Sequence, residues 1–430
     1  MAESAANGRA VDGAVDGAVD GAADGGVGIA AAAPVPSGAT AADLDAAFTR
    51  FVAIARSLPA ELVARPAAPL GPPVWDFGHV AQFTQEWLLV RLGAAPVAPL
   101  DRAERYDPEA HPRGERESEL EARAAMFARL KQVHSAALGI LRDGRFDARD
   151  PLVQGGWVWR MVAAHNDQHA EILIQWAQLV GCAVDVGAAQ PAQMPAGDAA
   201  RERVSFAPGP RSLGAPARSG YDNESPPHTQ HVQGFEIERW PLSNRRLIAF
   251  VDAGGYRDPV WWSPAGARFL AALECKAPHK WRRESDGTFT RERFGLRVPV
   301  KLDEPAEQLC AHEADALARF FGAQLPSEAQ WECAARAGAL ELASRGVWEW
   351  TLDTFGPYPG FEAWPYDAYS KVHFGRGYRV LRGCAWTATA RLARATYRNW
   401  DLPERRQLFA GLRLVYPASS ARAARRPGVV

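Results

Sequence analysis

Two histidines four residues apart are the first feature of this sequence that suggests chemistry. His165 and His169 lie in the string HNDQHAE, inside a stretch whose apolar residues recur every three or four positions, as in an α-helix. Residues i and i+4 of a helix lie one turn apart on the same face, so both imidazoles can reach one metal ion. His79 lies on the apolar stripe of another predicted helix, in the string WDFGH. The three histidines predict a metal site inside a helical bundle, where unpaired polar groups are costly.

The same three histidines also have a simpler interpretation, in which each ring is buried and satisfied by a hydrogen bond. A pair joined by a third inward-facing ring favours a metal, because ligands from facing helices commonly build such sites in bundle cores. Three ligands leave coordination positions open, which is typical of catalytic sites. Imidazole binds zinc, iron, nickel and copper, so the ligand types do not select the metal. Glu171, two residues beyond His169, either orients a ligand imidazole or is a surface charge.

Helices must position these histidines. Between about residues 41 and 182 the sequence holds helical segments with three- and four-residue apolar spacing, the predicted components of a four-helix bundle over 39–185. Pro72 and Pro73 lie where a helix can begin, and Gly181 follows the last segment as a stop signal.

The second half of the chain has a different composition and a different pattern of apolar residues. Residues 186–225 are rich in Ala, Pro, Gly and Ser, and we expect a linker or a long irregular entry into a second domain. Residues 226–418 alternate short apolar pieces with Gly/Pro turns. This pattern indicates an α+β domain with much loop and two clear helices, around 243–253 and 306–337.

Composition narrows the classes of function. Among 430 residues, Lys+Arg 49 balance Asp+Glu 50, which leaves no overall electrostatic footprint for nucleic acid or an anionic membrane. Five scattered cysteines without a C-x-x-C pair argue against a disulfide scaffold and a cysteine-rich zinc site. We see no secretory signal and no apolar run of membrane-spanning length, and expect a cytoplasmic protein. Residues 1–38 and 419–430 are predicted tails, the first a disordered Ala/Gly/Asp repeat.

Several longer strings add a resemblance to known families. HNDQHAE with the upstream WDFGH resembles the DinB-like bundle of ergothioneine sulfoxide synthases. LPSEAQWECAARAG, VWEWT, YRVLRG and AGLRL resemble the formylglycine-generating, sulfatase-modifying-factor fold, a C-type-lectin-like domain. HPRGER, PYPGF and RNWDLPERRQLFAGLR are similar to the synthase family in particular, and the resemblance covers about residues 45–417. It implies a multidomain α and α+β fold, with a four-helix DinB-like bundle followed by the lectin-like domain.

The resemblance also implies a chemistry. The family holds a mononuclear non-haem Fe(II) on three histidines, here His79, His165 and His169. With O2 it joins a small thiol or selenol to C2 of the imidazole of hercynine (Nα-trimethylhistidine), in ergothioneine or selenoneine biosynthesis. An iron ion that binds imidazole, thiolate and O2 together holds all three reactants in one complex, so that they need not meet in solution. The positions matching the family's substrate contacts are Gln168, Asn399 and Trp400 for hercynine, and Arg113, Arg116 and Asp401 for the donor's charged ends.

Two features depart from the family's pattern. Cys384 replaces the usual second glycine of an R-G-G string, and we expect a small buried residue there rather than a nucleophile. The family uses a tyrosine near iron as a proton or electron donor. Tyr358, Tyr366 and Tyr369 lie in the right region, while Phe361 can occupy the equivalent position. Two donors stay open: a thiol such as γ-glutamylcysteine or cysteine, which the arginines favour, and the uncharged selenosugar of a selenoneine synthase.

Three other functions fit parts of the sequence. A zinc-dependent DinB-type thiol transferase would use the same histidines to activate a thiol without O2. A formylglycine-generating enzyme would share the C-terminal fold but needs a pair of cysteines near the C-terminus, where only Cys384 lies. A non-catalytic lectin-like binding protein would leave the histidines without a purpose. Metal content and oxygen uptake separate these alternatives.

Overall fold

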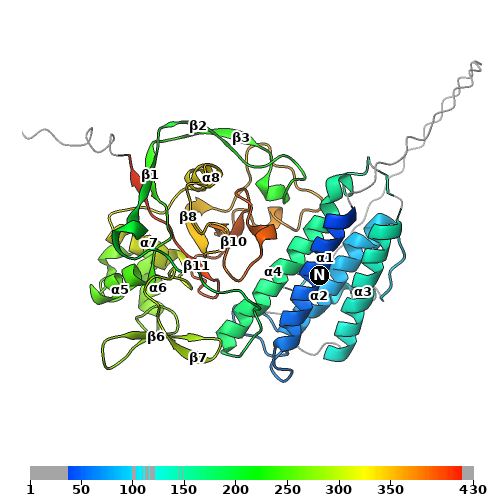
Figure 1. The fold of residues 1–430 in the computed structure, drawn as a ribbon, viewed down its shortest axis with the longest axis horizontal. Coiled ribbons are helices and arrows are strands. Elements are labelled where there is room, and N and C mark those ends of the chain that lie inside the picture. The colour runs from blue at the N-terminus through cyan, green and yellow to red at the C-terminus, as the bar shows by residue number, and fades with distance from the viewer. Residues whose placement is uncertain are drawn as a thin grey trace, which may run out of the picture.

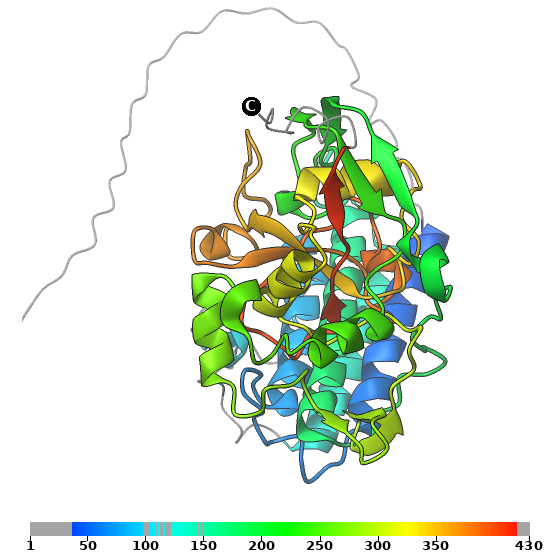
Figure 2. The same cartoon turned by 90° about the vertical axis from the view of Figure 1, so that its left-hand side faces the viewer.

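The protein has a helical bundle beside a mixed α/β domain (Figure 1), which confirms the predicted order of the two folds. The computed structural model describes residues 37–98, 103–108, 110–111, 116, 122–144, 146–147 and 149–418. Figure 2, seen from the side of the second domain, shows the bundle helices running behind the strands. In this part of the chain, no helix is both long and apolar enough to cross a bilayer.

Four α-helices form the bundle within the described residues: α1 (Ser37–Ser57), α2 (Pro73–Leu88), α3 (Arg123–Asp143) and α4 (Trp157–Val180). α1 packs mainly against α4, while α2 packs against both α3 and α4. Pro73 opens α2, where a missing backbone N–H costs nothing. Gly181 ends α4 with a φ of 72°, in the left-handed region that favours glycine. Both predicted boundary signals are confirmed.

The second domain carries four shorter α-helices among its described residues: α5 (Asn244–Asp252), α6 (Pro264–Ala272), α7 (Ala311–Phe320) and α8 (Glu328–Arg336). The first matches the helix predicted around 243–253. The single helix predicted over 306–337 is wrong, because the chain turns through Gly322 in the left-handed region and Ser327 then caps a new helix by accepting from the Gln330 amide. The sequence reading also missed α6.

The described strands of this domain form four sheets. One contains β1 (Arg203–Phe206), β4 (Phe235–Glu238) and β12 (Val415–Pro417). The small sheets are β2 (Gly209–Leu213) with β3 (His228–Val232), and β5 (Trp281–Arg283) with β6 (Phe289–Arg293) and β7 (Leu296–Pro299). The last has the order β10-β9-β8-β11, with β8 (Trp348–Thr354), β9 (Arg379–Gly383), β10 (Asn399–Asp401) and β11 (Ala410–Gly411). β1 and β2 lie within 186–225, so this stretch contributes strands to the second domain.

The bundle and the second domain share one continuous apolar core. Trp176 of α4 and Trp348 and Trp350 of β8 are buried in the same cluster. α4 is the bundle helix next to the strands (Figure 1), and the Trp348 indole donates to Glu171 of α4 at 2.9 Å. β10 is the edge strand of its sheet and pairs antiparallel with β9, with Trp400 opposite Val380. The packing of the two domains therefore determines where residues 399–401 lie relative to α4.

Candidate metal centre and substrate site

The three predicted ligand histidines lie together inside the bundle. One ring nitrogen from each of His79, His165 and His169 lies within 4.8 Å of the other two, and all three side chains are buried. The Nε2 atoms of His79 and His165 are 3.1 Å apart. α2 contributes one histidine and α4 the i, i+4 pair, as the helical spacing predicted.

Contacts at the Nδ1 atom orient two of the three imidazole rings, those of His79 and His169. His79 Nδ1 lies 2.7 Å from the carbonyl oxygen of Tyr106, which only accepts, so Nδ1 carries the proton and Nε2 is free to ligate. His169 Nδ1 lies 2.9 Å from the carboxylate of Asp76, a residue that the sequence reading missed. Such carboxylate and carbonyl contacts fix the tautomer and the ring plane of metal-ligating histidines. The sequence places Asp76 three residues before His79 on the same predicted helix, but it gives no signal for the contact with His169, which spans 93 positions.

Stacked aromatic rings hold the imidazole planes. Trp75 stacks on His79 with ring centroids 4.7 Å apart, and Phe83 stacks on His165 with centroids 3.7 Å apart. Burial, with the charge of the neighbouring histidines, lowers the pKa of both His79 and His165 well below the usual range. Neutral imidazoles keep the lone pairs that a metal requires.

Simple hydrogen bonding does not satisfy this cluster. His165 Nδ1 is buried and has no hydrogen bond of normal geometry among the described residues. A core histidine held only by hydrogen bonds normally uses its buried nitrogens. Converging lone pairs on oriented rings fit a divalent metal with three nitrogen ligands and open positions.

Glu171 has neither of the two roles considered for it. Two residues along a helix turn the side chain by about 200°, so Glu171 lies on the opposite face of α4 from His169 and cannot orient that ring. It is also not a surface charge, because it is buried and accepts from Trp348 and from the Thr387 hydroxyl, each at 2.9 Å. Burial raises its pKa. Glu171 joins α4 to the second domain.

Gln168 is held by three phenols. Its Nε2 donates to Tyr397 at 2.7 Å and to Tyr369 at 3.2 Å, and its Oε1 accepts from Tyr221 at 3.0 Å. Burial raises the pKa of all three hydroxyls, which therefore stay protonated. The phenols fix the orientation of the amide one residue before His169. Of these three tyrosines the sequence analysis named only Tyr369, as a candidate donor near iron, and it predicted none of the three contacts with Gln168, which span 53 to 229 positions.

Trp400 and Asn399 reach the same region from β10. The Trp400 ring stacks on Phe355 with centroids 4.1 Å apart, and it lies nearly perpendicular to the Tyr369 ring, with centroids 5.8 Å apart. Because Tyr369 also contacts Gln168, the predicted hercynine residues are linked through one tyrosine. Asn399 Oδ1 accepts from the Trp400 amide at 2.9 Å, which fixes the start of this strand.

The structure describes two of the three residues predicted to bind the donor, Arg116 and Asp401. Arg113 lies outside the described residues. The Arg116 guanidinium lies over Trp75, 3.5 Å from the ring centroid. Trp75 in turn stacks on His79, so Trp75 contacts both residues. Asp401 accepts from Gln407 at 2.8 Å and lies 3.7 Å from Arg405.

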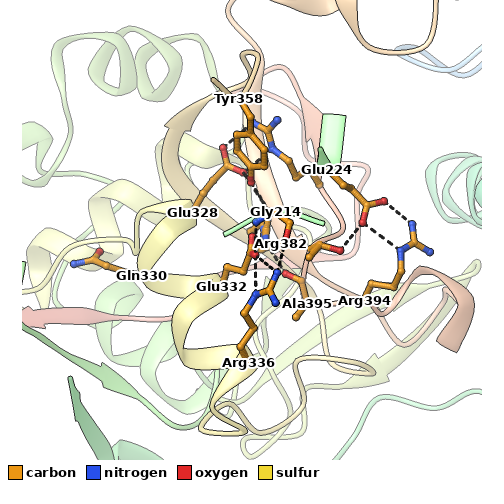
Figure 3. Close-up of polar contacts among 12 residues, drawn as sticks. Gly214, Glu224, Glu328, Gln330, Glu332, Arg336, Tyr358, Arg382, Arg394 and Ala395 are labelled. Atoms are coloured by element: carbon orange, nitrogen blue, oxygen red, sulfur yellow. Dashed lines mark hydrogen bonds and ion pairs between the residues drawn. The ribbon is translucent and has the colours of Figure 1, made fainter. Parts of the chain in front are cut away.

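The candidate tyrosines have different surroundings, and Figure 3 shows those of Tyr358. Tyr358 is in a buried ion network, with its hydroxyl 3.5 Å from both Glu328 and Arg382, and not in the histidine cluster. Tyr366 packs beside Phe83, with centroids 6.4 Å apart, and Phe83 stacks on His165, one of the three predicted ligands.

Phe361 and Cys384 also lie apart from the histidines. Phe361 packs edge-on against Phe374, with centroids 5.1 Å apart. Cys384 is fully buried, and burial raises the pKa of its thiol. A thiol in that environment stays protonated and is a poor nucleophile. The expectation of a small buried residue at this position is confirmed.

Comparison with known families gives both domains a class. Residues 43–173 match the DinB superfamily, and residues 188–345 and 344–418 match the Sulfatase-modifying factor enzyme 1-like domain. The chain is thus a two-domain protein of the DinB and sulfatase-modifying-factor type, with its histidine cluster in the DinB part.

Relatives that span both domains narrow the class further. "Hercynine oxygenase" of Mycolicibacterium thermoresistibile is 34% identical over 419 residues, which cover 84% of this chain and 90% of the relative. "Hercynine oxygenase" of Mycobacterium tuberculosis is 33% identical and covers 83% of this chain and 93% of its own length. "Formylglycine-generating enzyme" of Mycobacterium tuberculosis is 33% identical, but only over 29% of this chain and 49% of that relative. The chain belongs to the hercynine oxygenase family and is an oxidoreductase.

Proposed function

We propose that this protein uses a mononuclear iron on His79, His165 and His169 to couple a small thiol oxidatively to C2 of the hercynine imidazole, in ergothioneine biosynthesis. The observation that carries the proposal is the oriented, buried histidine trio in a chain that matches hercynine oxygenases over both domains. Nitrogen ligands with open positions suit non-haem iron, which binds O2 and thiolate.

The reaction balances without a further reductant. The thiol loses its S–H hydrogen and hercynine loses the hydrogen on C2, while a C–S bond forms. One atom of O2 becomes the sulfoxide oxygen and the other leaves as water with the two hydrogens. Bound iron supplies the template that holds the reactants within bonding distance.

The surrounding residues bind and orient the substrates in this proposal. Gln168, with its amide fixed by three tyrosines, and Asn399 contact the hercynine imidazole. Trp400 faces the trimethylammonium group, since an indole face attracts such a cation. Arg116, with Arg113 and Asp401, binds the charged ends of the donor, because a guanidinium fork suits a carboxylate.

Aerobic incubation with Fe(II), hercynine and a panel of donors tests the function. We expect oxygen uptake together with a coupled sulfoxide detected by mass spectrometry, and loss of both in His169→Ala. His134→Ala is a matched control, since His134 is also a buried bundle histidine but pairs with Asp45 at 3.0 Å, away from the cluster. Product formation with zinc and without O2 would instead support a DinB-type thiol transferase.

The donor panel decides between sulfur and selenium. γ-Glutamylcysteine and cysteine carry carboxylates that suit the two arginines of HPRGER, whereas a 1-selenosugar is uncharged. Coupling of the thiol that weakens in Arg113→Ala and Arg116→Ala supports the sulfur donor. A wild-type protein that couples only the selenosugar is a selenoneine synthase, and the arginines then have another role.

A further inference from the structure

Asp401, at the end of β10, is held by a residue outside the predicted set of site residues. The Gln407 amide donates from Nε2 to Asp401 Oδ2 at 2.8 Å. An ionised carboxylate accepts hydrogen bonds and does not donate them, so the amide nitrogen must face Asp401. The amide oxygen of Gln407 therefore faces away from the carboxylate.

That amide oxygen has no partner. Gln407 is only 1% exposed, and its Oε1 is buried without a hydrogen bond among the described residues. A buried acceptor left unpaired costs free energy, and native proteins contain few of them. A methionine of similar length would fill the same space without that cost. Packing alone therefore does not explain a glutamine at this position, whereas its hydrogen bond to Asp401 does.

The charge of Asp401 is balanced locally. Arg405 Nε lies 3.7 Å from Asp401 Oδ1, which also accepts from the backbone N–H of Leu402 at 2.8 Å. Because a cation lies beside the carboxylate, net charge does not select a ligand at this position. The carboxylate instead selects by hydrogen bonding, since it can accept only from a group that carries N–H or O–H hydrogens.

Asp401 also lies next to the proposed hercynine residues. Residues i and i+2 of a strand share a face, so Asp401 lies on the same side of β10 as Asn399, about 7 Å along the strand. Trp400, between them, contacts Tyr369, which accepts from Gln168 at 3.2 Å. A group bound at Asp401 is therefore adjacent to a residue proposed to contact hercynine.

We propose that Gln407 is a positioning residue for the donor. It holds the Asp401 carboxylate in the orientation that accepts a hydrogen bond from an ammonium or hydroxyl group of the donor. Gln407 acts through Asp401 and does not touch the donor, since its own side chain is buried. A site built to bond a substrate N–H or O–H rejects the analogue that lacks this group. The inference rests on the proposed function, because that function supplies the donor.

Steady-state kinetics of the iron-loaded, full-length protein with two sets of donors test the inference. Cysteine is compared with 3-mercaptopropionate, which lacks the ammonium group, and a 1-selenosugar is compared with its deoxy forms, each of which lacks one hydroxyl. In Gln407→Met we expect the KM of the complete donor to rise about tenfold, the usual loss for a charged hydrogen bond. The KM of the matching analogue, the KM of hercynine and kcat should stay unchanged. The set that responds identifies the recognised group as ammonium or hydroxyl.

Further variants separate an effect through Asp401 from a general disturbance. In an Asp401→Ala background, Gln407→Met should add nothing, because the two residues act as one unit. Gln407→Asn, whose amide is one methylene shorter, repeats the test if the methionine variant does not fold. Gln85→Met is the matched control, since Gln85 is an equally buried glutamine whose amide bonds only the backbone of residues 97 and 98. Its donor KM should equal that of the wild type.

Other outcomes overturn the inference. Equal losses for a complete donor and its analogue mean that Gln407 supports the fold of the site in general. Unchanged kinetics with both sets, or an additive loss in the Asp401→Ala background, mean that Gln407 does not position Asp401. Calorimetry of donor binding without O2 separates this inference from the proposed function. A selective loss of donor binding in Gln407→Met, with no coupled product from the wild type, removes the proposed function and leaves the role of Gln407 intact.

Discussion

Replacing Asp76 by Asn tests the metal centre without removing a ligand. The Asp76 carboxylate is 2.9 Å from His169 Nδ1, and both side chains are buried. Loss of such a carboxylate typically weakens metal binding about 10- to 100-fold. This range corresponds to about 1.4 to 2.7 kcal/mol of binding free energy. Asn keeps the shape of Asp but not its charge, so the change isolates the electrostatic support of the imidazole.

The assay is competition for Fe(II) or Co(II) against a coloured chelator under anaerobic conditions. Asp45→Asn is the matched control, since Asp45 forms a similar carboxylate–imidazole contact with His134 at 3.0 Å elsewhere in the bundle. We expect weaker metal binding in Asp76→Asn and wild-type binding in Asp45→Asn. Equal metal affinities in all three proteins, with folding intact, would refute the argument that Asp76 supports a ligand.

Three further outcomes are expected. His169→Ala should lose stoichiometric iron by elemental analysis, because two nitrogen ligands hold a divalent metal poorly; full retention contradicts the ligand set. Trp400→Ala should weaken hercynine binding more than donor binding in calorimetry, and equal losses contradict its role. Burial raises the pKa of Asp222 to about 6, so the folded state binds this proton more tightly than the unfolded state does. Stability should therefore fall as pH rises from about 4 to about 6, and Asp222→Asn should raise the free energy of unfolding at neutral pH by up to about 3 kcal/mol but not below pH 4; a pH-independent difference contradicts this.

The histidine cluster could be predicted because its signal is local. His165 and His169 share one helix face by spacing alone, and the apolar stripe around His79 shows that it points inward. The helix ends at Pro73 and Gly181 follow from backbone chemistry that each residue carries with it. Local rules decide all of these features.

The contacts around the cluster could not be predicted in the same way. Asp76 meets His169 across 93 positions of sequence, and Tyr397 meets Gln168 across 229. Neither spacing nor periodicity reports which distant segments pack together. Glu171 is different, because its position two residues after His169 already places it on the far face of the helix. Helix geometry alone therefore excludes Glu171 as a support for the His169 ring.

That far face explains how the second domain contributes to the proposed metal centre. Asp167 and Glu171 lie on the side of α4 opposite the ligand histidines and bind Arg391 and Trp348 of the second domain. A helix rotation of about 20° would move a side-chain tip near the 5–6 Å radius by about 2 Å. Metal–ligand distances tolerate only about 0.2 Å. The buried acids therefore fix the rotation of α4, so the docking of the second domain sets the position of the histidines although it supplies no ligand among the three.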